Sequence, residues 1–154
     1  MLERLLPRTL DNDYRGHPAA LWLFVLITAV TLWRSWVHLM WPDGGAQSIA
    51  TIPLDTYTAG GAASVVTVFA LWGLSQILIG CFYVIVLLRY RALLALMYLG
   101  LLVEYVGRMV VGLMKPIVTL ERPPGAAGNL IFTGLGLIGL VLAMRRRGAA
   151  DTQP

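Results

Sequence analysis

Four long apolar segments dominate this chain of 154 residues, and they restrict the folds that are open to it. The segments are expected at about residues 19–41, 64–88, 92–114 and 126–144. Each is long enough to cross a hydrocarbon core of about 30 Å as an α-helix. Backbone polar groups in lipid must be hydrogen-bonded within their own segment, which favours helices. The sequence therefore predicts an all-α polytopic membrane protein, built as a bundle of four transmembrane helices.

The composition supports this class. Hydrophobic residues make up 58% of the chain and charged residues 13%, whereas about a quarter of a soluble domain is charged. The segments leave no length for a separate soluble domain, so we expect residues 1–154 to form one integral membrane domain. Trp-Arg-Ser-Trp at residues 33–36 lacks the small residues of a cleavage site, so the first segment is not expected to be a removed signal peptide.

The basic residues outside the segments alternate between the two sides of the membrane. Three arginines precede the first segment, two lie in the turn at residues 89–91, and three follow the fourth segment at 145–147. The loop at 42–63 has none, and the third loop has Lys115 and Arg122. The positive-inside rule therefore predicts that both termini are cytoplasmic. The preference for arginine over lysine is typical of a GC-rich bacterium, so the expected location is a bacterial inner membrane.

Charged and polar side chains lie inside the apolar segments. Ionised groups in hydrocarbon are costly unless they are paired or hydrated, so they mark functional sites or structural ion pairs. With a helical rise of 1.5 Å per residue, six such side chains fall in the middle and outer half of the bundle. They are the predicted ligand-binding residues: Arg34, His38, Gln76, Glu104, Arg108 and Asn129.

Small and polar residues share helix faces with these six side chains. Such faces favour close helix packing in lipid, so we expect them to point inward and to enclose a polar cavity that opens outward. The faces are formed by Thr28, Thr31, Ser35 and His38; by Gly73, Gln76, Gly80 and Tyr83; by Gly100, Glu104, Gly107, Arg108 and Val111; and by Asn129, Thr133 and Gly136.

The charges inside the segments do not balance. Glu104 and Arg108 have the i, i+4 spacing of an intrahelical pair, although Glu104 could instead bridge to Arg34. Either arrangement leaves a surplus of about one positive charge. Asp43 or Asp55 of the outer loop could neutralise it, or an anionic ligand such as a lipid phosphate or a carboxylate, which the planar guanidinium binds through two hydrogen bonds. The structural alternative is that the arginines snorkel to the headgroups, or that Glu104 forms a purely structural ion pair.

Other kinds of site are not supported by the sequence. The G-x-G-x-x-G match at residues 134–139 lies inside an apolar run with no preceding strand, so it predicts a packing face instead of a nucleotide site. The single cysteine, Cys81, and the lack of metal-ligand spacing predict no metal site, and His38 alone cannot provide two haem ligands. No catalytic triad is recognisable. We expect no cofactor and no nucleic-acid partner.

Three functional hypotheses remain. The preferred one is binding or transport of an anionic or amphipathic, lipid-like ligand in a homo-oligomer, because four short helices enclose little space. The second is a membrane enzyme acting on a lipid or quinone-like substrate, with His38 or Glu104 as general acid or base. The third is an accessory subunit of a larger membrane complex. The loop at 42–63 is either an ordered functional element or a disordered connector, and the architecture alone transfers no function.

Overall fold

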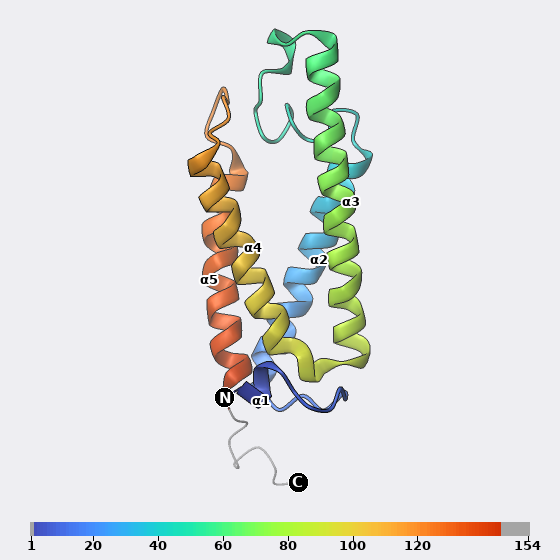
Figure 1. The fold of residues 1–154 in the computed structure, drawn as a ribbon, viewed down its shortest axis with the longest axis vertical. Helices are drawn as coiled ribbons and strands as arrows, with labels where there is room; N and C mark the ends of the chain where they lie inside the picture. Colours follow the sequence, from blue (N-terminus) through green and yellow to red (C-terminus); the bar gives the residue numbers. More distant parts are fainter. Residues whose placement is uncertain (1, 146–154) are drawn as a thin grey trace.

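The computed structural model describes residues 2–145, which form an all-helical bundle (Figure 1). Arg146 and Arg147, which entered the topology prediction, lie outside the described residues. The helical elements in chain order are α1 (Leu2–Leu5), α2 (Pro18–Met40), the 3₁₀ turn η1 (Leu54–Thr56), α3 (Ala59–Arg89), the 3₁₀ turn η2 (Arg91–Leu93), α4 (Leu94–Met114) and α5 (Pro124–Met144).

Four helices within residues 2–145 are long and apolar enough to cross a membrane: α2, α3, α4 with η2, and α5. The prediction of a multi-pass, four-helix membrane protein is confirmed. One boundary was wrong, because α3 begins at Ala59 instead of residue 64. Thr58 caps it there by accepting a hydrogen bond from the Gly61 N–H at 3.2 Å. As a result α3 has 31 residues, against 21 to 23 in the other three helices.

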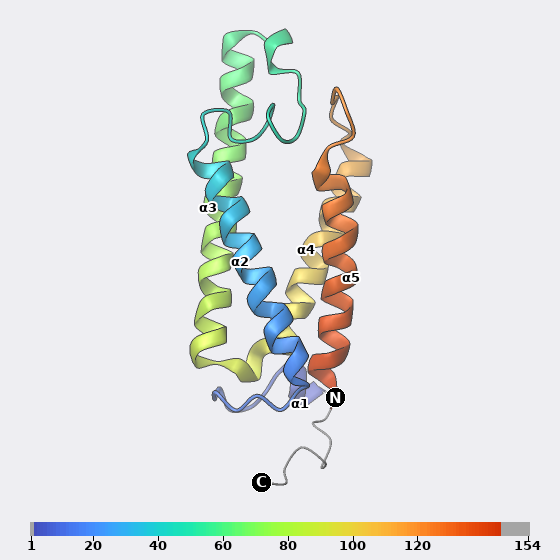
Figure 2. The same ribbon diagram turned by 180° about the vertical axis from the view of Figure 1, so that it is seen from behind.

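The four helices form two pairs. α2 packs mainly on α3, and α4 packs mainly on α5, whereas α3 and α4 share few contacts. The pairs approach each other at the end of the bundle that carries α1 and η2, here called the terminal end (Figures 1 and 2). They diverge toward the opposite end, here called the loop end, which carries the segments at 41–58 and 115–123.

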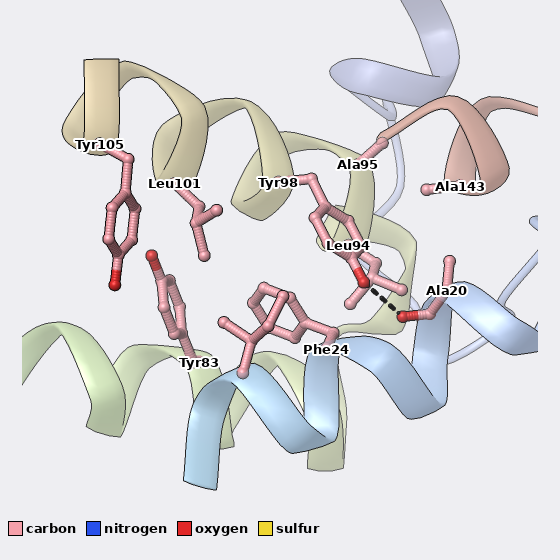
Figure 3. Packing of buried hydrophobic residues seen from close by; sticks show 10 residues of the cluster. Ala20, Phe24, Tyr83, Leu94, Ala95, Tyr98, Leu101, Tyr105 and Ala143 are labelled. Atoms are coloured by element: carbon pink, nitrogen blue, oxygen red, sulfur yellow. Dashed lines mark hydrogen bonds between the residues drawn. The ribbon is translucent and has the colours of Figure 1, made fainter. Parts of the chain in front are cut away.

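An aromatic core joins the two pairs near the terminal end (Figure 3). The Phe24 ring lies 4.9 Å from the Tyr83 ring and 5.1 Å from the Tyr98 ring, measured between centroids. The Tyr98 hydroxyl donates a hydrogen bond of 2.6 Å to the carbonyl of Ala20, so the polar end of this buried ring is satisfied. This core fixes the position of α4 against α2, and therefore the register of the charged residues farther along both helices.

The predicted inward faces are confirmed on α2 and α3. All four residues of each face are buried: Thr28, Thr31, Ser35 and His38 on α2, and Gly73, Gln76, Gly80 and Tyr83 on α3. On α5 Gly136 is buried, and Asn129 and Thr133 are half-buried.

The predicted face of α4 was wrong in part. In the described part of the chain, no atom beyond the local α4 backbone lies within 4 Å of where a Cβ would stand on Gly100 or Gly107, and Val111 is 57% exposed. The reason is that Tyr98 and Tyr105 turn into the core. Each glycine follows one of these tyrosines by two residues, about 200° around the helix, and so faces outward.

The segment at 41–58, here called the first loop, is folded. The carboxylate of Asp43 accepts three backbone hydrogen bonds, from Gly45 at 2.9 Å, Gln47 at 3.1 Å and Ser48 at 2.7 Å. Farther along, apolar loop side chains form a small core against α3, made by Ala46, Ile52 and Leu54 with Val65, Val66 and Phe69. The loop is therefore ordered, and the alternative of a disordered connector is wrong, while a functional role of the loop stays a prediction.

The loop is expected to lose its order in acid. Burial raises the pKa of the Asp43 carboxyl, but the three N–H donors outweigh it and hold that pKa below its usual value. Since the folded pKa is depressed, the ionised form stabilises the loop above about pH 4, and this stabilisation is lost as the pH falls through the folded pKa. Hydrogen-exchange protection of the amides of residues 45–48 should therefore fall at low pH.

The matched substitutions Asp43→Asn and Asp55→Asn separate this effect from general acid damage. Asp43→Asn should reduce the protection already at neutral pH. Asp55→Asn should change the protection little, because the Asp55 carboxylate accepts from a side chain, that of Gln47 at 2.7 Å, and not from the backbone amides that are measured. Equal protection in both variants would show that the Asp43 carboxylate does not organise the loop.

Hydrogen bonds connect the two segments of the loop end, at 41–58 and 115–123. The Thr51 hydroxyl donates to the carbonyl of Glu121 at 2.9 Å, and the Leu120 N–H donates to the carbonyl of Thr51 at 2.9 Å. Thr51 has a φ of 55°, which is unfavourable for a β-branched residue. These bonds link the α2–α3 pair to the α4–α5 pair where the two pairs have diverged, and they account for the strained backbone.

Candidate functional site

Arg34 lies at the centre of the candidate site, where it extends from α2 into the bundle. Its Nη1 donates to the Tyr105 hydroxyl of α4 at 3.1 Å, and its Nη2 donates to Oε1 of Gln76 of α3 at 3.4 Å. Its Nε is buried and has no hydrogen-bond partner among the described residues. One guanidinium therefore connects three helices, and both of its partners are neutral.

Arg108 is paired within its own helix. It forms an ion pair with Glu104, one turn earlier on α4, and the two side chains are only 17% and 22% exposed. The intrahelical alternative is therefore confirmed, and the bridge from Glu104 to Arg34 is not formed. Among residues 2–145, no ion pair joins Arg34 to a carboxylate.

Two aromatic rings hold the two guanidinium groups in one cluster. The Cζ of Arg108 lies 4.8 Å from the ring centroids of both Trp72 and Tyr105. The Cζ of Arg34 lies 5.5 Å from the Trp72 centroid and 5.9 Å from that of Tyr105. The negative faces of these rings attract cations, which offsets part of the repulsion between the two arginines. We call Arg34, Arg108, Glu104, Gln76, Trp72 and Tyr105 the cation cluster.

Trp72 and Tyr105 were missing from the residues predicted from the sequence. A signal for both was present, since Trp72 lies four residues before Gln76 and Tyr105 three residues before Arg108. Residues at these spacings share a helix face. Aromatic residues in membrane segments are usually assigned to lipid contact or packing, which hid their role beside the arginines.

His38 joins the cluster to the first loop. Its ring centroid lies 4.5 Å from that of Trp72 and 5.8 Å from that of Phe69. Its Nδ1 donates a hydrogen bond to the carbonyl oxygen of Gly44 at 2.7 Å, because a carbonyl oxygen can only accept. Gly44 has a φ of 59°, a conformation that a glycine adopts without strain, so the loop can turn back onto the histidine.

The sixth predicted residue, Asn129, is not part of these interactions. It is half-buried near the start of α5, and its backbone carbonyl accepts a hydrogen bond from the Thr133 hydroxyl at 2.7 Å. Within the described part of the chain, no hydrogen bond joins the Asn129 side chain to the cation cluster. The structure thus connects Arg34, His38, Gln76, Glu104 and Arg108, and leaves Asn129 without a demonstrated link to them.

The acids of the first loop do not neutralise the cluster. The carboxylate of Asp43 binds backbone N–H groups of its own loop, and that of Asp55 binds the Gln47 side chain. The cluster therefore contains two guanidinium groups and one carboxylate, that of Glu104, which pairs with Arg108. The surplus of one positive charge expected from the sequence is present in the folded chain.

Two hollows lie near the two ends of the bundle, and neither is lined by any of the six predicted ligand-binding residues. The polar cavity predicted around those six side chains is not one of these hollows and stays a prediction. One hollow, of about 370 Å³, lies at the terminal end between the N-terminal segment and the ends of α4 and α5. The other, of about 300 Å³, lies at the loop end between the first loop, α3 and Ile117. We call the second the loop hollow. Phe69, which contacts His38, is one of its wall residues.

Comparisons with known proteins add no assignment to this geometry. No protein-family model matches the chain, and neither the curated proteins nor the solved structures include a significant match to it. The function must therefore be inferred from the chemistry of the cation cluster itself.

Proposed function

We propose that this protein binds the anionic group of an amphipathic ligand in a bacterial inner membrane, and that the cation cluster is the binding site. The observation that carries the proposal is the charge count. Two guanidinium groups, those of Arg34 and Arg108, share the rings of Trp72 and Tyr105, while Glu104 provides one carboxylate. An uncompensated cation in a membrane is costly, so an anion that binds beside Arg34 is strongly favoured.

The hydrogen bonds of Arg34 support binding over snorkelling. A snorkelling arginine directs its guanidinium to the headgroups, away from the protein. Arg34 instead reaches across the bundle to Tyr105 and Gln76. Its buried Nε keeps one donor free, and a carboxylate or phosphate oxygen is the partner that a guanidinium donor binds most strongly.

The charge distribution supports access from outside the cell. The positive-inside rule assigns the terminal end to the cytoplasm and the loop end to the outside. Arg34 lies six residues before the end of α2 at Met40, and Arg108 lies six residues before the end of α4 at Met114. Both arginines are therefore about 9 Å from the loop end of their helices, on the side that an external ligand would enter.

The enzyme hypothesis receives less support from the same geometry. A general acid or base must reach the reacting group, and His38 is engaged by the carbonyl of Gly44. No hydrogen bond or ion pair within residues 2–145 joins His38 to Glu104. We therefore assign His38 to holding the first loop, and keep binding as the proposed function.

The proposal is tested with three ten-carbon probes of different charge, namely decanoate, decyl phosphate and decyltrimethylammonium. Native mass spectrometry of the detergent-solubilised protein measures the fraction that carries each probe. Decanoate and decyl phosphate should bind and the cationic probe should not. Arg34→Gln removes the positive charge of an arginine that has no carboxylate partner, and it should weaken anion binding by at least about tenfold.

Arg89→Gln is the matched control, because Arg89 is an exposed arginine at the terminal end of α3. It should bind both anions as the wild type does. Equal retention of the anions by wild type and Arg34→Gln, or equal retention of the cationic probe, would overturn the proposed function.

A further inference from the structure

The loop hollow is an apolar space of about 300 Å³ whose walls come from three parts of the chain. α3 contributes Ser64, Val65, Val68 and Phe69, the first loop contributes Ile52 and Tyr57, and Ile117 follows α4. Its size is at the lower limit of ordinary small-molecule sites. Val68 and Ile117 are 62% and 63% exposed, so the hollow is open to the surroundings of the bundle.

The loop hollow and the cation cluster lie along one stripe of α3. Val65, Phe69, Trp72 and Gln76 follow each other at spacings of four, three and four residues, which places them on one helix face. The first two line the hollow, and the last two belong to the cluster. The Phe69 and Trp72 rings meet edge to face with centroids 6.0 Å apart, so a wall residue of the hollow contacts a residue of the cluster.

The order of the two regions along α3 identifies the kind of ligand. Seven residues separate Phe69 from Gln76, so the hollow lies about 10 Å nearer the loop end than the polar partner of Arg34. A phospholipid of the outer leaflet has the opposite order, with its head at the surface and its chains toward the midplane. A ligand that fills both regions here enters from outside with its charged end first.

Resting on the proposed function, we propose that the ligand is a single-chain organic monoanion, such as a medium-chain alkyl carboxylate. Its carboxylate binds beside Arg34, and its chain extends past Trp72 and Phe69 into the loop hollow. One negative charge balances the surplus of the cluster. The hollow favours one chain over two because of its small volume, and its apolar walls are suited to methylene groups.

The test uses decanoate that carries a photoreactive diazirine on its terminal carbon. After irradiation of the detergent-solubilised protein, peptide mass spectrometry locates the label. The label should lie within residues 52–69 or on Ile117. Labels confined to the exposed faces of α4 and α5 would overturn the inference, even where the probe binds in an Arg34-dependent manner.

Two substitutions on α3 form a matched pair for the same measurement. Val68→Trp fills the loop hollow and should weaken decanoate binding by about tenfold, while butyrate, which is too short to reach the hollow, should bind as in the wild type. Leu71→Trp adds the same ring at an exposed position outside the hollow and should leave both unchanged.

The two proposals fail in different ways. If decanoate binding depends on Arg34 but Val68→Trp has no effect, the cation cluster binds anions and the assignment of the hollow is wrong. If a two-chain phosphatidic acid binds more tightly than decanoate and is insensitive to Val68→Trp, the ligand is a membrane lipid. If no anion binds in an Arg34-dependent manner, the proposed function itself is wrong.

Discussion

Replacing Gly73 with valine should separate α2 from α3 and lower the free energy of unfolding by about 3 kcal/mol. A Cβ on Gly73 would stand 2.8 Å from the backbone nitrogen of Leu39 and 2.9 Å from the carbonyl oxygen of Ser35. These are atoms of the α2 backbone, which cannot rotate away as a side chain does. The two helices must therefore move apart, and the contact between His38 of α2 and Trp72 of α3 should be lost as they separate.

The measurement is unfolding of the purified protein in mixed micelles with increasing SDS, followed by circular dichroism. Gly100→Val is the matched control, because it adds the same side chain to a helix glycine whose Cβ position has no atom of another described helix or loop within 4 Å. The control should unfold at the SDS fraction of the wild type. Equal midpoints for both variants would show that the close approach of α2 and α3 at Gly73 is not formed.

The second large effect is expected for Glu104→Ala, which leaves two arginines around Trp72 and Tyr105 without a carboxylate. Removing one partner of a buried pair costs about 3 to 5 kcal/mol, and the partial exposure of this pair indicates the lower end, about 3 kcal/mol. The same SDS titration measures the loss. The double variant Glu104→Ala with Arg108→Leu removes the unpaired charge as well, and should recover most of the stability.

The binding assay gives an independent check on this substitution. Without Glu104 the net charge of the cluster rises from one positive charge to two, so the single variant should bind decanoate more tightly. The double variant, which also lacks Arg108, returns to one positive charge and should not. A single variant as stable as the double one, with unchanged affinity for decanoate, would show that Glu104 does not neutralise the cluster.

The fold was largely predictable because membrane helices follow from hydropathy alone. Segment length and the cost of unpaired backbone groups in lipid leave a bundle of helices as the solution, and the four segments were found to within a few residues. The exception, the start of α3, depends on the cap at Thr58 and on the loop core around Ile52. Both are soluble-type interactions, for which hydropathy contains no information.

The charged residues of the site could be predicted from the sequence, whereas the neutral groups that bind them were harder to predict. Arg34, Glu104 and Arg108 are conspicuous in any apolar sequence, and the i, i+4 spacing of the last two indicated their ion pair. Whether Arg34 would bind Tyr105 depends on the rotation of α4 about its axis. That rotation is set by the packing of Tyr98 against Phe24 and Ala20, contacts between residues more than 70 positions apart.

The unequal helix lengths have a consequence for the choice of membrane. α3, at about 46 Å, is longer than a hydrocarbon core of about 30 Å, while α5 at about 32 Å matches it closely. Hydrophobic mismatch therefore acts on one helix pair more than on the other. We expect a thicker bilayer to bring the capped start of α3 and the first loop closer to the acyl chains, and a thinner one to expose them to water. The length of the lipid chains should therefore change the surroundings of the loop end.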